Sequence, residues 1–317
     1  MTTFAFVFPG QGSQSVGMLD AWNGHPAVQT ALQEASEALG QDLAELIHQG
    51  PKEELGLTTN TQPVMLVAAI AAYRVWLAEG GKTPAYVAGH SLGEYSALVA
   101  SGVLSLTQAV PLVRLRAQAM QEAVVVGAGA MAAVLGLEAA KVVEICAQAQ
   151  AGFAAGSGEV VQAANFNDPG QTVISGSKAA VDKACELLKA AGAKRTLPLP
   201  VSAPFHCALM KPAAEKLRLH LNSISMQAPQ IPVINNIDVA QENDPARICD
   251  ALYRQAFGPV RWVESMQRMQ QLGVSHVVEC GPGKVLTGMV KRICPELQSQ
   301  ALYDPATLAE TRAFLTA

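Results

Sequence analysis

The sequence predicts an α/β protein in which a large body with a parallel sheet at its core carries one smaller inserted module. Short apolar runs that are typical of buried strands alternate with longer helical patterns along most of the chain. Between residues 128 and 198 the order becomes strand, helix, strand, strand, helix, strand, which is that of a ferredoxin-like module. We therefore expect a body formed by residues 1–127 and 199–317 and an insert formed by residues 128–198.

The composition favours a globular protein with a large core. Of the 317 residues, 50% are hydrophobic and 15% are charged, and the formal net charge is −4. No basic run indicates a nucleic-acid surface, no signal peptide is expected, and apolar runs such as 64–72 are too short to span a bilayer. The six cysteines lack a Cys-x-x-Cys pair, and without an export signal we expect reduced, buried thiols. We also expect no metal site and a cytoplasmic protein.

Periodicity places the elements of the body. The strand candidates are 4–8, 86–88, 233–237 and 274–280, and the helix candidates are 26–39, 42–48, 64–77, 95–101, 105–123, 210–221, 246–257, 263–272 and a segment after 284. Ser105 and Gln108 have the spacing of a capping box. Pro111 is expected to kink or loosen the first turns of that helix. The residues beyond the last core helix are interpreted as a tail.

The elements of the insert follow from the same patterns. Strands are expected at 130–136, 160–165, 172–175 and 195–201, and helices at 138–149 and 179–191. Residues 167–170 (NDPG) are a turn signal between the second and third strands. The cleft between insert and body is the expected ligand site, because such sites form preferentially between domains.

The segment 86–94 (YVAGHSLGE) combines an apolar strand, the pattern Gly-x-Ser-x-Gly and the start of a helix, which is the context of a nucleophile elbow. Gly89 and Gly93 lie where the tight turn leaves no room for a Cβ atom. Ser91 would project from the turn near the positive end of the following helix. The backbone N–H of Leu92 would point to where an oxyanion forms.

A second glycine-rich turn follows the first strand at residues 9–14 (PGQGSQ). It does not match the dinucleotide-binding fingerprint, since the third glycine is Gly17 rather than residue 15. Gly10 and Gly12 still free the backbone, so that a main-chain N–H such as that of Gln11 can face a ligand.

A serine nucleophile needs a base, and His206 and His276 are the main candidates among six histidines. His206 follows a proline-containing loop where the chain returns from the insert, so it is expected to face the cleft and is preferred. His276 lies in a predicted strand, where a role in the core or at an edge is expected.

The rival arrangement is that of a serine hydrolase, in which an acidic residue between the serine and a C-terminal histidine orients the base. It would combine Ser91 and His276 with Asp238 or Asp244.

Arg114 and Arg116 are the only charged residues between Pro111 and Glu122. They leave the helix in different directions, because successive positions are about 100° apart. One is expected to be solvated and the other to face the interior or a cleft, and the pattern does not decide between them.

Together these segments resemble the family of malonyl-CoA:acyl-carrier-protein transacylases from end to end. The matching motifs are 8–14 (FPGQGSQ), 89–94 (GHSLGE), Arg116 with 120–123 (MQEA) and 129–133 (GAMAA), 206–210 (HCALM), Gln255 and 281–287 (GPGKVLT). Their occurrence in one order makes the resemblance specific. It implies an α/β-hydrolase-like body with a ferredoxin-like insert, in agreement with the patterns above.

The resemblance implies a ping-pong transfer of the malonyl group from malonyl-CoA to the phosphopantetheine thiol of acyl carrier protein. Ser91 would attack the thioester while His206 takes its proton. The N–H groups of Gln11 and Leu92 would hold the oxyanion. A backbone carbonyl near Gln255 would orient the histidine in place of a carboxylate.

The resemblance also implies substrate-binding residues. Arg116 would hold the free malonyl carboxylate through two charge-assisted hydrogen bonds. Gln255 and His90 would line the site, whereas pattern alone places Gln255 on an exposed helix face and makes His90 a packing residue. Phe205 resembles the bulky residue of malonyl-selective modules.

The expected partners are malonyl-CoA and an acidic acyl carrier protein, with no nucleic acid, membrane, metal or resident cofactor, and the protein is expected to be a monomer. The pathway is either fatty-acid or polyketide synthesis, and a non-catalytic scaffold is a further alternative. The basic residues expected to dock the carrier protein are Lys189, Lys194, Arg195, Lys284 and Lys291.

Overall fold

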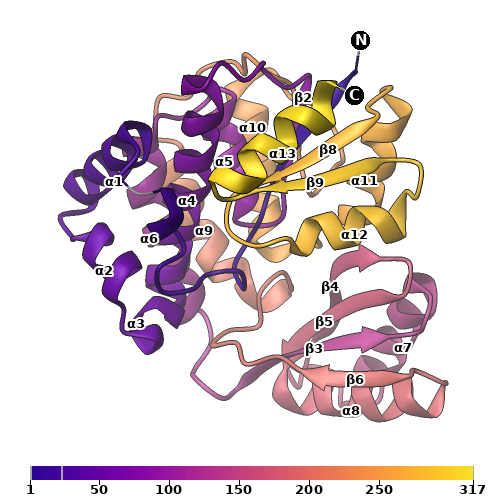
Figure 1. Ribbon diagram of the computed structural model, residues 1–317. Helices are drawn as coiled ribbons and strands as arrows, with labels where there is room; N and C mark the ends of the chain where they lie inside the picture. The colour runs from indigo at the N-terminus through magenta and orange to yellow at the C-terminus, as the bar shows by residue number, and fades with distance from the viewer. Residues whose placement is uncertain (1, 23, 317) are drawn as a thin grey trace.

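A five-stranded parallel sheet forms the centre of the body in the computed structural model, which describes residues 2–22 and 24–316 (Figure 1). Its strands are β1 (Phe4–Phe8), β2 (Tyr86–Gly89), β7 (Val233–Ile234), β8 (His276–Cys280) and β9 (Gln298–Leu302). Their order is β7-β2-β1-β8-β9, and every neighbouring pair is parallel. The carboxyl ends of β1 and β2 therefore meet at one edge, which is where ligands bind in such sheets.

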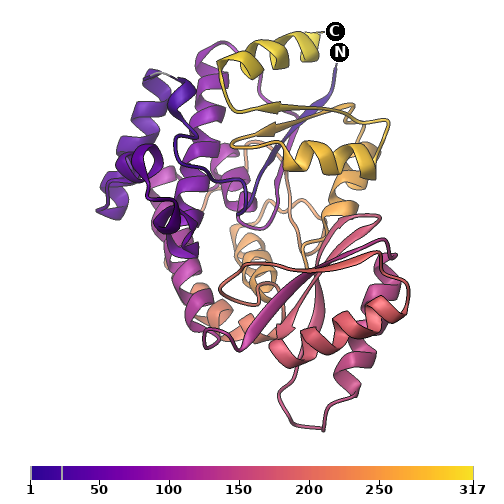
Figure 2. The ribbon, with the colours of Figure 1, turned by 60° about the horizontal axis from the view of Figure 1, so that its bottom comes forward.

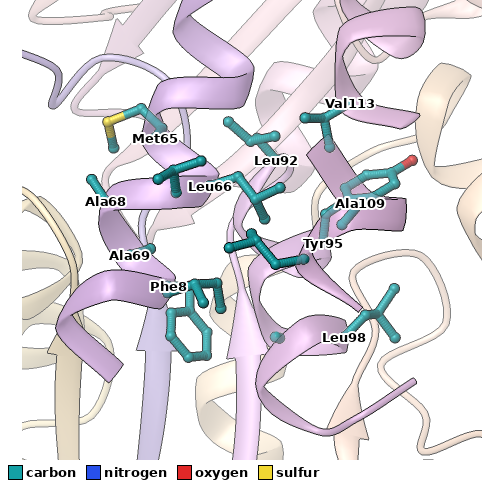
Figure 3. Packing of buried hydrophobic residues seen from close by; sticks show 14 of the residues in the cluster. Phe8, Met65, Leu66, Ala68, Ala69, Leu92, Tyr95, Leu98, Ala109 and Val113 are labelled. Atoms are coloured by element: carbon teal, nitrogen blue, oxygen red, sulfur yellow. The ribbon is translucent and has the colours of Figure 1, made fainter. Parts of the chain in front are cut away.

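Helices cover both faces of this sheet, which explains why β1 is apolar at every position. On one face lie α1 (Pro26–Leu39), α4 (Thr58–Ala78), α5 (Gly93–Ala100) and α6 (Leu106–Glu122), and on the other α11 (Trp262–Gln271) and α12 (Val285–Ile293). Phe6 and Phe8 pack edge-on against Tyr73 of α4, with ring centroids 5.9 and 6.2 Å apart. Ala5 and Val7 face the opposite layer. Figure 3 shows the first layer where α4, α5 and α6 meet.

Helix α4 begins earlier than the sequence pattern predicts. The predicted start was residue 64, but the helix runs from Thr58 through Pro63. The polar residues 58–63 lie outside the predicted helix, yet two of their side chains have tertiary partners: Thr61 Oγ1 donates to the carbonyl of Leu55, and Gln62 accepts from Arg116. By length and composition α4 could cross a membrane, but 83% of its apolar window is buried inside the protein, which identifies it as a core helix.

Helix α6 is continuous past Pro111, and the predicted kink or loosening of its first turns stays a prediction. Its N-terminus carries the predicted capping box, in which Ser105 and Gln108 exchange side-chain and backbone hydrogen bonds. The cap fixes the start of the helix and thereby the direction of the residues that follow.

The remaining helices of the body lie around these layers. They are η1 (Asp20–Trp22), α2 (Leu43–Gln49), α3 (Lys52–Gly56), η2 (Ala208–Met210), α9 (Lys211–Leu221), α10 (Pro245–Phe257) and α13 (Pro305–Thr316). The interpretation of the C-terminal segment as a tail is wrong. β9 completes the sheet and α13 packs beside it, because Leu302 and Leu308 are buried in the main core.

The insert has its own antiparallel sheet of strand order β4-β5-β3-β6. Its elements are β3 (Gly129–Leu135), α7 (Ala139–Ala151), β4 (Val161–Asp168), β5 (Gln171–Ser177), α8 (Lys178–Ala190) and β6 (Arg195–Pro198). This is the predicted ferredoxin-like βαββαβ order. All six elements fall within 128–198, and the exact boundaries of the unit stay a prediction. Both views show the insert at one end of the body (Figures 1 and 2).

One face of the insert sheet packs on α7 and α8, and the other contacts the connection back to the body. β6 ends at Pro198, three residues before the predicted end, because Leu199 and Val201 turn onto this second face. Strand β4 also joins the body: the Phe166 N–H donates to the carbonyl of Val260 at 3.0 Å, and the Val260 N–H donates to that of Ala164 at 2.9 Å.

We expect β9 to be required for stability. Leu302→Ala removes a side chain with no exposed surface and should lower the free energy of unfolding by about 2–5 kcal/mol. The matched control is Leu219→Ala, because Leu219 is 73% exposed and its truncation should cost about 0.5 kcal/mol or less. Denaturant unfolding of both variants measures the difference, and equal losses would contradict the placement of β9 in the core sheet.

Candidate active site

Ser91 lies on a sharp turn between β2 and α5, as the Gly-x-Ser-x-Gly pattern predicts. Its φ is +52°, in the left-handed region that residues other than glycine rarely adopt. A Cβ atom at Gly89 would lie 1.9 Å from the carbonyl of Gly93, and one at Gly93 would lie 2.0 Å from the carbonyl oxygen of Phe8. The turn therefore requires glycine at both positions, and α5 starts directly against the end of β1.

The hydroxyl of Ser91 is paired with His206. Ser91 Oγ lies 2.7 Å from His206 Nε2, and His206 Nδ1 lies 3.0 Å from the carbonyl oxygen of Gln255 and 3.2 Å from that of Gly258. Because carbonyl oxygens only accept, Nδ1 carries the proton and Nε2 is free to accept from the serine hydroxyl. The ring is thus oriented by two backbone carbonyls.

The surroundings of His206 keep its imidazole neutral. Burial, and then the positive charge of Arg116, lower the pKa of His206 from 6.5 to about 3. A neutral ring with Nε2 unprotonated is the form that can take a proton from Ser91.

The segment around His206 is held by the insert as well as by the body. His206 itself has a φ of +61°. Directly after it, the N–H of Ala208 donates to Oε1 of Gln162 on β4 at 2.7 Å. The base is therefore fixed between the C-terminal end of α10 in the body and strand β4 of the insert.

Arg116, rather than Arg114, faces the site. Its Nη1 donates to Gln62 Oε1 at 2.8 Å, and its Nη2 donates to Ser91 Oγ at 3.2 Å and to Gln255 Oε1 at 3.1 Å. The guanidinium lies over the ring of Tyr95, 5.4 Å from its centroid. Arg114 is half-buried and donates to side chains away from this cluster.

The charge of Arg116 has no ion-pair partner among residues 2–22 and 24–316. Its Nε is buried and also lacks a hydrogen-bond acceptor in this part of the chain. Since buried charges are normally paired, the site has spare capacity for an anion beside Ser91.

Gln255 connects the reactive groups rather than lying on an exposed helix face. It is fully buried, and its Nε2 donates to the Ser91 carbonyl and to Glu94 Oε2, both at 3.0 Å. Its Oε1 accepts from Arg116 and its main-chain carbonyl accepts from His206. One residue thus contacts the nucleophile, the base and the cation.

A cavity of about 450 Å³ opens onto these groups between the body and the insert. Gln11, Leu92 and Phe205 lie on its wall together with Ser91 and His206. Gln11 and Leu92 are therefore placed where their main-chain N–H groups were expected, and their donor role stays a prediction.

His90 also lines the cavity, but its ring is engaged elsewhere. Its Nε2 lies 2.8 Å from Oδ1 of Asn167 on β4, and the ring packs edge-on against Trp262 at 5.5 Å. Burial lowers the pKa of His90. The contacts make it a link between the elbow and the insert, so its expected part in substrate binding stays a prediction.

The rival hydrolase arrangement is not assembled. His276 pairs with Phe4 at the start of the strands, whereas Ser91 follows their far ends, and its ring packs against Phe314 at 4.7 Å. Asp238 binds Arg254 through two hydrogen bonds of 2.7 and 2.6 Å. Asp244 caps α10 by accepting from the N–H of Ala246. The hypothesis that Ser91 and His276 act together is therefore wrong.

Gln62, Glu94 and Asn236 had no predicted role, although all three are buried at the site. Glu94 could have been noticed as the one charged residue of the helix that follows the elbow, and Asn236 as the second of two amides after the apolar strand β7. Burial raises the pKa of Glu94 to about 7. Within the described residues, no group of three or more His, Cys, Asp or Glu side chains could hold a metal ion.

The acyl transferase domain family matches residues 5–308 of the chain. The chain belongs to this family. It is 54% identical over 310 residues to the malonyl CoA-acyl carrier protein transacylase of Escherichia coli, with 98% of each chain covered. It is 58% identical to the acyl-carrier-protein S-malonyltransferase of Burkholderia pseudomallei, whose crystal structure superposes with a TM-score of 0.95 over the whole of both chains.

A further similar structure is a complex of a malonyl-transacylase with its type II polyketide acyl-carrier protein. The malonyl-transacylase in that complex is 50% identical to this chain and superposes with a TM-score of 0.93. The match covers 97% of this chain and 98% of that chain. Both structural likenesses extend over nearly the whole chain and therefore over the body and the insert.

The lowered pKa of His206 predicts a defined pH dependence of stability. As the pH falls below 6.5, the unfolded chain binds a proton that the buried ring, with its pKa of about 3, does not accept. The folded state therefore loses stability as the pH falls. Between pH 7 and pH 5 the free energy of unfolding of the wild type should fall by about 2 kcal/mol more than that of His206→Gln.

Urea titrations of both proteins at the two pH values test this expectation. The difference between wild type and variant removes the contributions of other groups, Glu94 included. Equal pH dependences would show that His206 titrates normally in the folded protein.

Proposed function

We propose that this protein transfers the malonyl group of malonyl-CoA to the phosphopantetheine thiol of acyl carrier protein by a ping-pong mechanism. The observation that carries the proposal is the position of Arg116, a buried cation without an ion-pair partner in the described residues, 3.2 Å from the hydroxyl that is paired with His206. A nucleophile next to a carboxylate receptor suits an acyl group that ends in a carboxylate. The names of the relatives describe the same reaction.

In the first half-reaction Ser91 Oγ attacks the thioester carbonyl carbon and its proton passes to His206 Nε2. The N–H groups of Gln11 and Leu92 stabilise the oxyanion. When the intermediate collapses, the carbon–sulfur bond breaks and His206 returns the proton to the leaving CoA sulfur. The nearby charge of Arg116 disfavours the imidazolium, so it promotes this return. The product is a malonyl-Ser91 ester.

In the second half-reaction the carrier thiol follows the reverse course. His206 takes the thiol proton, the sulfur attacks the ester carbonyl, and Ser91 leaves with the proton from His206. All groups in this scheme come from one chain and none requires a resident cofactor, so we propose a cytoplasmic monomer that works without one.

Arg116 provides the selectivity for malonyl over acetyl groups. Its guanidinium is planar and keeps unused donors, so it can bind the free carboxylate through two parallel hydrogen bonds. An acetyl group would leave this buried charge unpaired. Gln62 and Tyr95 hold the guanidinium in place before substrate arrives.

Fatty-acid synthesis is the proposed pathway, in line with the malonyl CoA-acyl carrier protein transacylases of Escherichia coli and Haemophilus influenzae, to which the chain is similar. Service to a polyketide carrier protein is the second candidate, because one similar structure is a complex with such a protein. Loading rates with the two classes of carrier protein would separate these possibilities.

Intact-protein mass spectrometry after mixing with malonyl-CoA or acetyl-CoA tests the proposed chemistry. Wild type should gain one malonyl group and Ser91→Ala none. Arg116→Ala should form the malonyl-enzyme about 10²-fold more slowly, equivalent to about 3 kcal/mol, because two hydrogen bonds to a charged group are lost. It should not lose acetyl transfer.

Arg114→Ala is the matched control, since it removes an arginine from the same helix without touching the cavity. Release of free CoA without any acyl-enzyme, at times short enough to trap the ester, would instead indicate a hydrolase. Equal effects of the two arginine variants would refute the assignment of Arg116 as the carboxylate receptor.

We further propose that exposed basic residues on the insert and on α12 dock the acidic carrier protein. They are Lys189, Lys194, Arg195, Lys284 and Lys291. Reversal of their charges should raise the KM for carrier protein, more at low salt than at high salt, and leave malonyl-CoA loading unchanged. Lys82→Glu is the control, because Lys82 precedes β2 at the opposite edge of the sheet. Equal changes in both half-reactions would refute this surface.

A further inference from the structure

Strand β7 stops before its neighbour β2 does. The paired residues are Val87 with Val233 and Ala88 with Ile234, and the ladder ends there. Continued in the same register, Asn236 would lie opposite His90. The sequence pattern predicts a strand that continues to residue 237. In the structure the backbone pairing with β2 instead ends at Ile234, next to the nucleophile elbow.

The side chain of Asn236 supplies the hydrogen bonds that the missing strand residue would have made. In a parallel ladder a residue donates to the carbonyl before its partner and accepts from the N–H after it. Asn236 Nδ2 donates to the carbonyl of Gly89 at 2.7 Å, and Asn236 Oδ1 accepts from the N–H of Ser91 at 2.7 Å. These two groups flank His90. Since one is an acceptor and the other a donor, the orientation of the amide is fixed.

The main chain of Asn236 is held separately, so its side chain is free for this task. Its N–H donates to Glu94 Oε2 at 2.9 Å, and its carbonyl accepts from the N–H of Arg261 at 3.2 Å. The same Glu94 oxygen accepts from Gln255 Nε2. Asn236 has no exposed surface, so water does not replace any of these bonds.

This contact acts on the part of the elbow that is under strain. Ser91 has a left-handed backbone, and its N–H would lie without a partner if the amide of Asn236 were removed. The direction of the Ser91 side chain, and hence the 2.7 Å contact of Oγ with His206 Nε2, depends on this peptide plane.

We propose that Asn236 is a positioning residue that fixes the peptide of Ser91, and thereby its Oγ, for attack on the acyl group. The inference rests on the proposed role of Ser91 as nucleophile. Asn236 does not line the cavity, so it acts through Ser91 rather than on the substrate.

Asn236→Ala tests the proposal, with Asn235→Ala as the matched control. Asn235 is the preceding residue, is buried as well, and uses its Oδ1 to accept from the N–H of Asp238. The rate constant of Ser91 acylation by malonyl-CoA in stopped-flow measurements should fall about 10²-fold in Asn236→Ala only, because misplacement of a reacting group costs about that much. The Kd for malonyl-CoA, measured in a Ser91→Ala background, should be the same with and without Asn236→Ala.

Asn236→Asp adds a readout that general destabilisation would not produce. A protonated carboxyl group has the shape of the amide and can donate to Gly89 while accepting from Ser91, whereas a carboxylate cannot donate. Burial next to Glu94 raises the pKa of such a carboxyl group. The acylation rate of Asn236→Asp relative to wild type should therefore rise as the pH is lowered.

The outcomes separate the inference from the proposed function. If wild type forms no malonyl-enzyme, the role of Ser91 itself fails. If wild type is acylated and Asn236→Ala reacts as fast as Asn235→Ala, the positioning role of Asn236 is refuted. If Asn236→Ala does not fold, Asn236→Asp decides: a rate ratio that does not change with pH overturns the proposal.

Discussion

The close approach of helix α5 to the end of strand β1 is the constraint on which the site depends. A side chain at Gly93 would collide with the Phe8 carbonyl, and one at Gly89 would collide with Gly93 itself. Only this approach allows the chain to reverse within three residues and to present Ser91 above the sheet edge. Buried side chains of α4 and α6 pack against α5, and Leu92 and Tyr95 lie at this contact (Figure 3).

Polar groups at the bottom of the cavity form a network of side-chain amides around the guanidinium of Arg116. Gln62 and Gln255 accept hydrogen bonds from Arg116, and the side-chain N–H groups of Gln255 donate to Glu94 and to the carbonyl of Ser91. Both acceptors are neutral amides, and the carboxylate of Glu94, which attracts the guanidinium from beyond ion-pair distance, is linked to it through Gln255. The buried guanidinium is thus oriented before substrate arrives, so that the carboxylate of the substrate would complete the hydrogen bonding of this network.

The sequence was informative where chemistry is local and uninformative where partners are distant in the chain. The elbow, the capping box and the βαββαβ order depend on neighbouring residues, and a motif, a spacing and the periodicity of the elements indicated them in turn. The contacts of Gln62 and Asn236 join segments 54 and 145 positions apart, and no local pattern encodes them. The same limit explains the early start of α4, whose first turns look like a loop until their tertiary partners are known. β9 was missed because five weakly apolar residues resemble a tail without the neighbouring strand β8.

The insert leaves the body and returns to it through neighbouring strands, with Ala132 opposite Pro198. Ser91 and His206 are 115 positions apart, and bringing them together from an unfolded chain requires the closure of a long loop. Once the insert has folded by itself, its two ends are already adjacent, so the loop that remains to be closed is far shorter. We therefore expect the insert to form first during folding and the two reactive residues to pair afterwards.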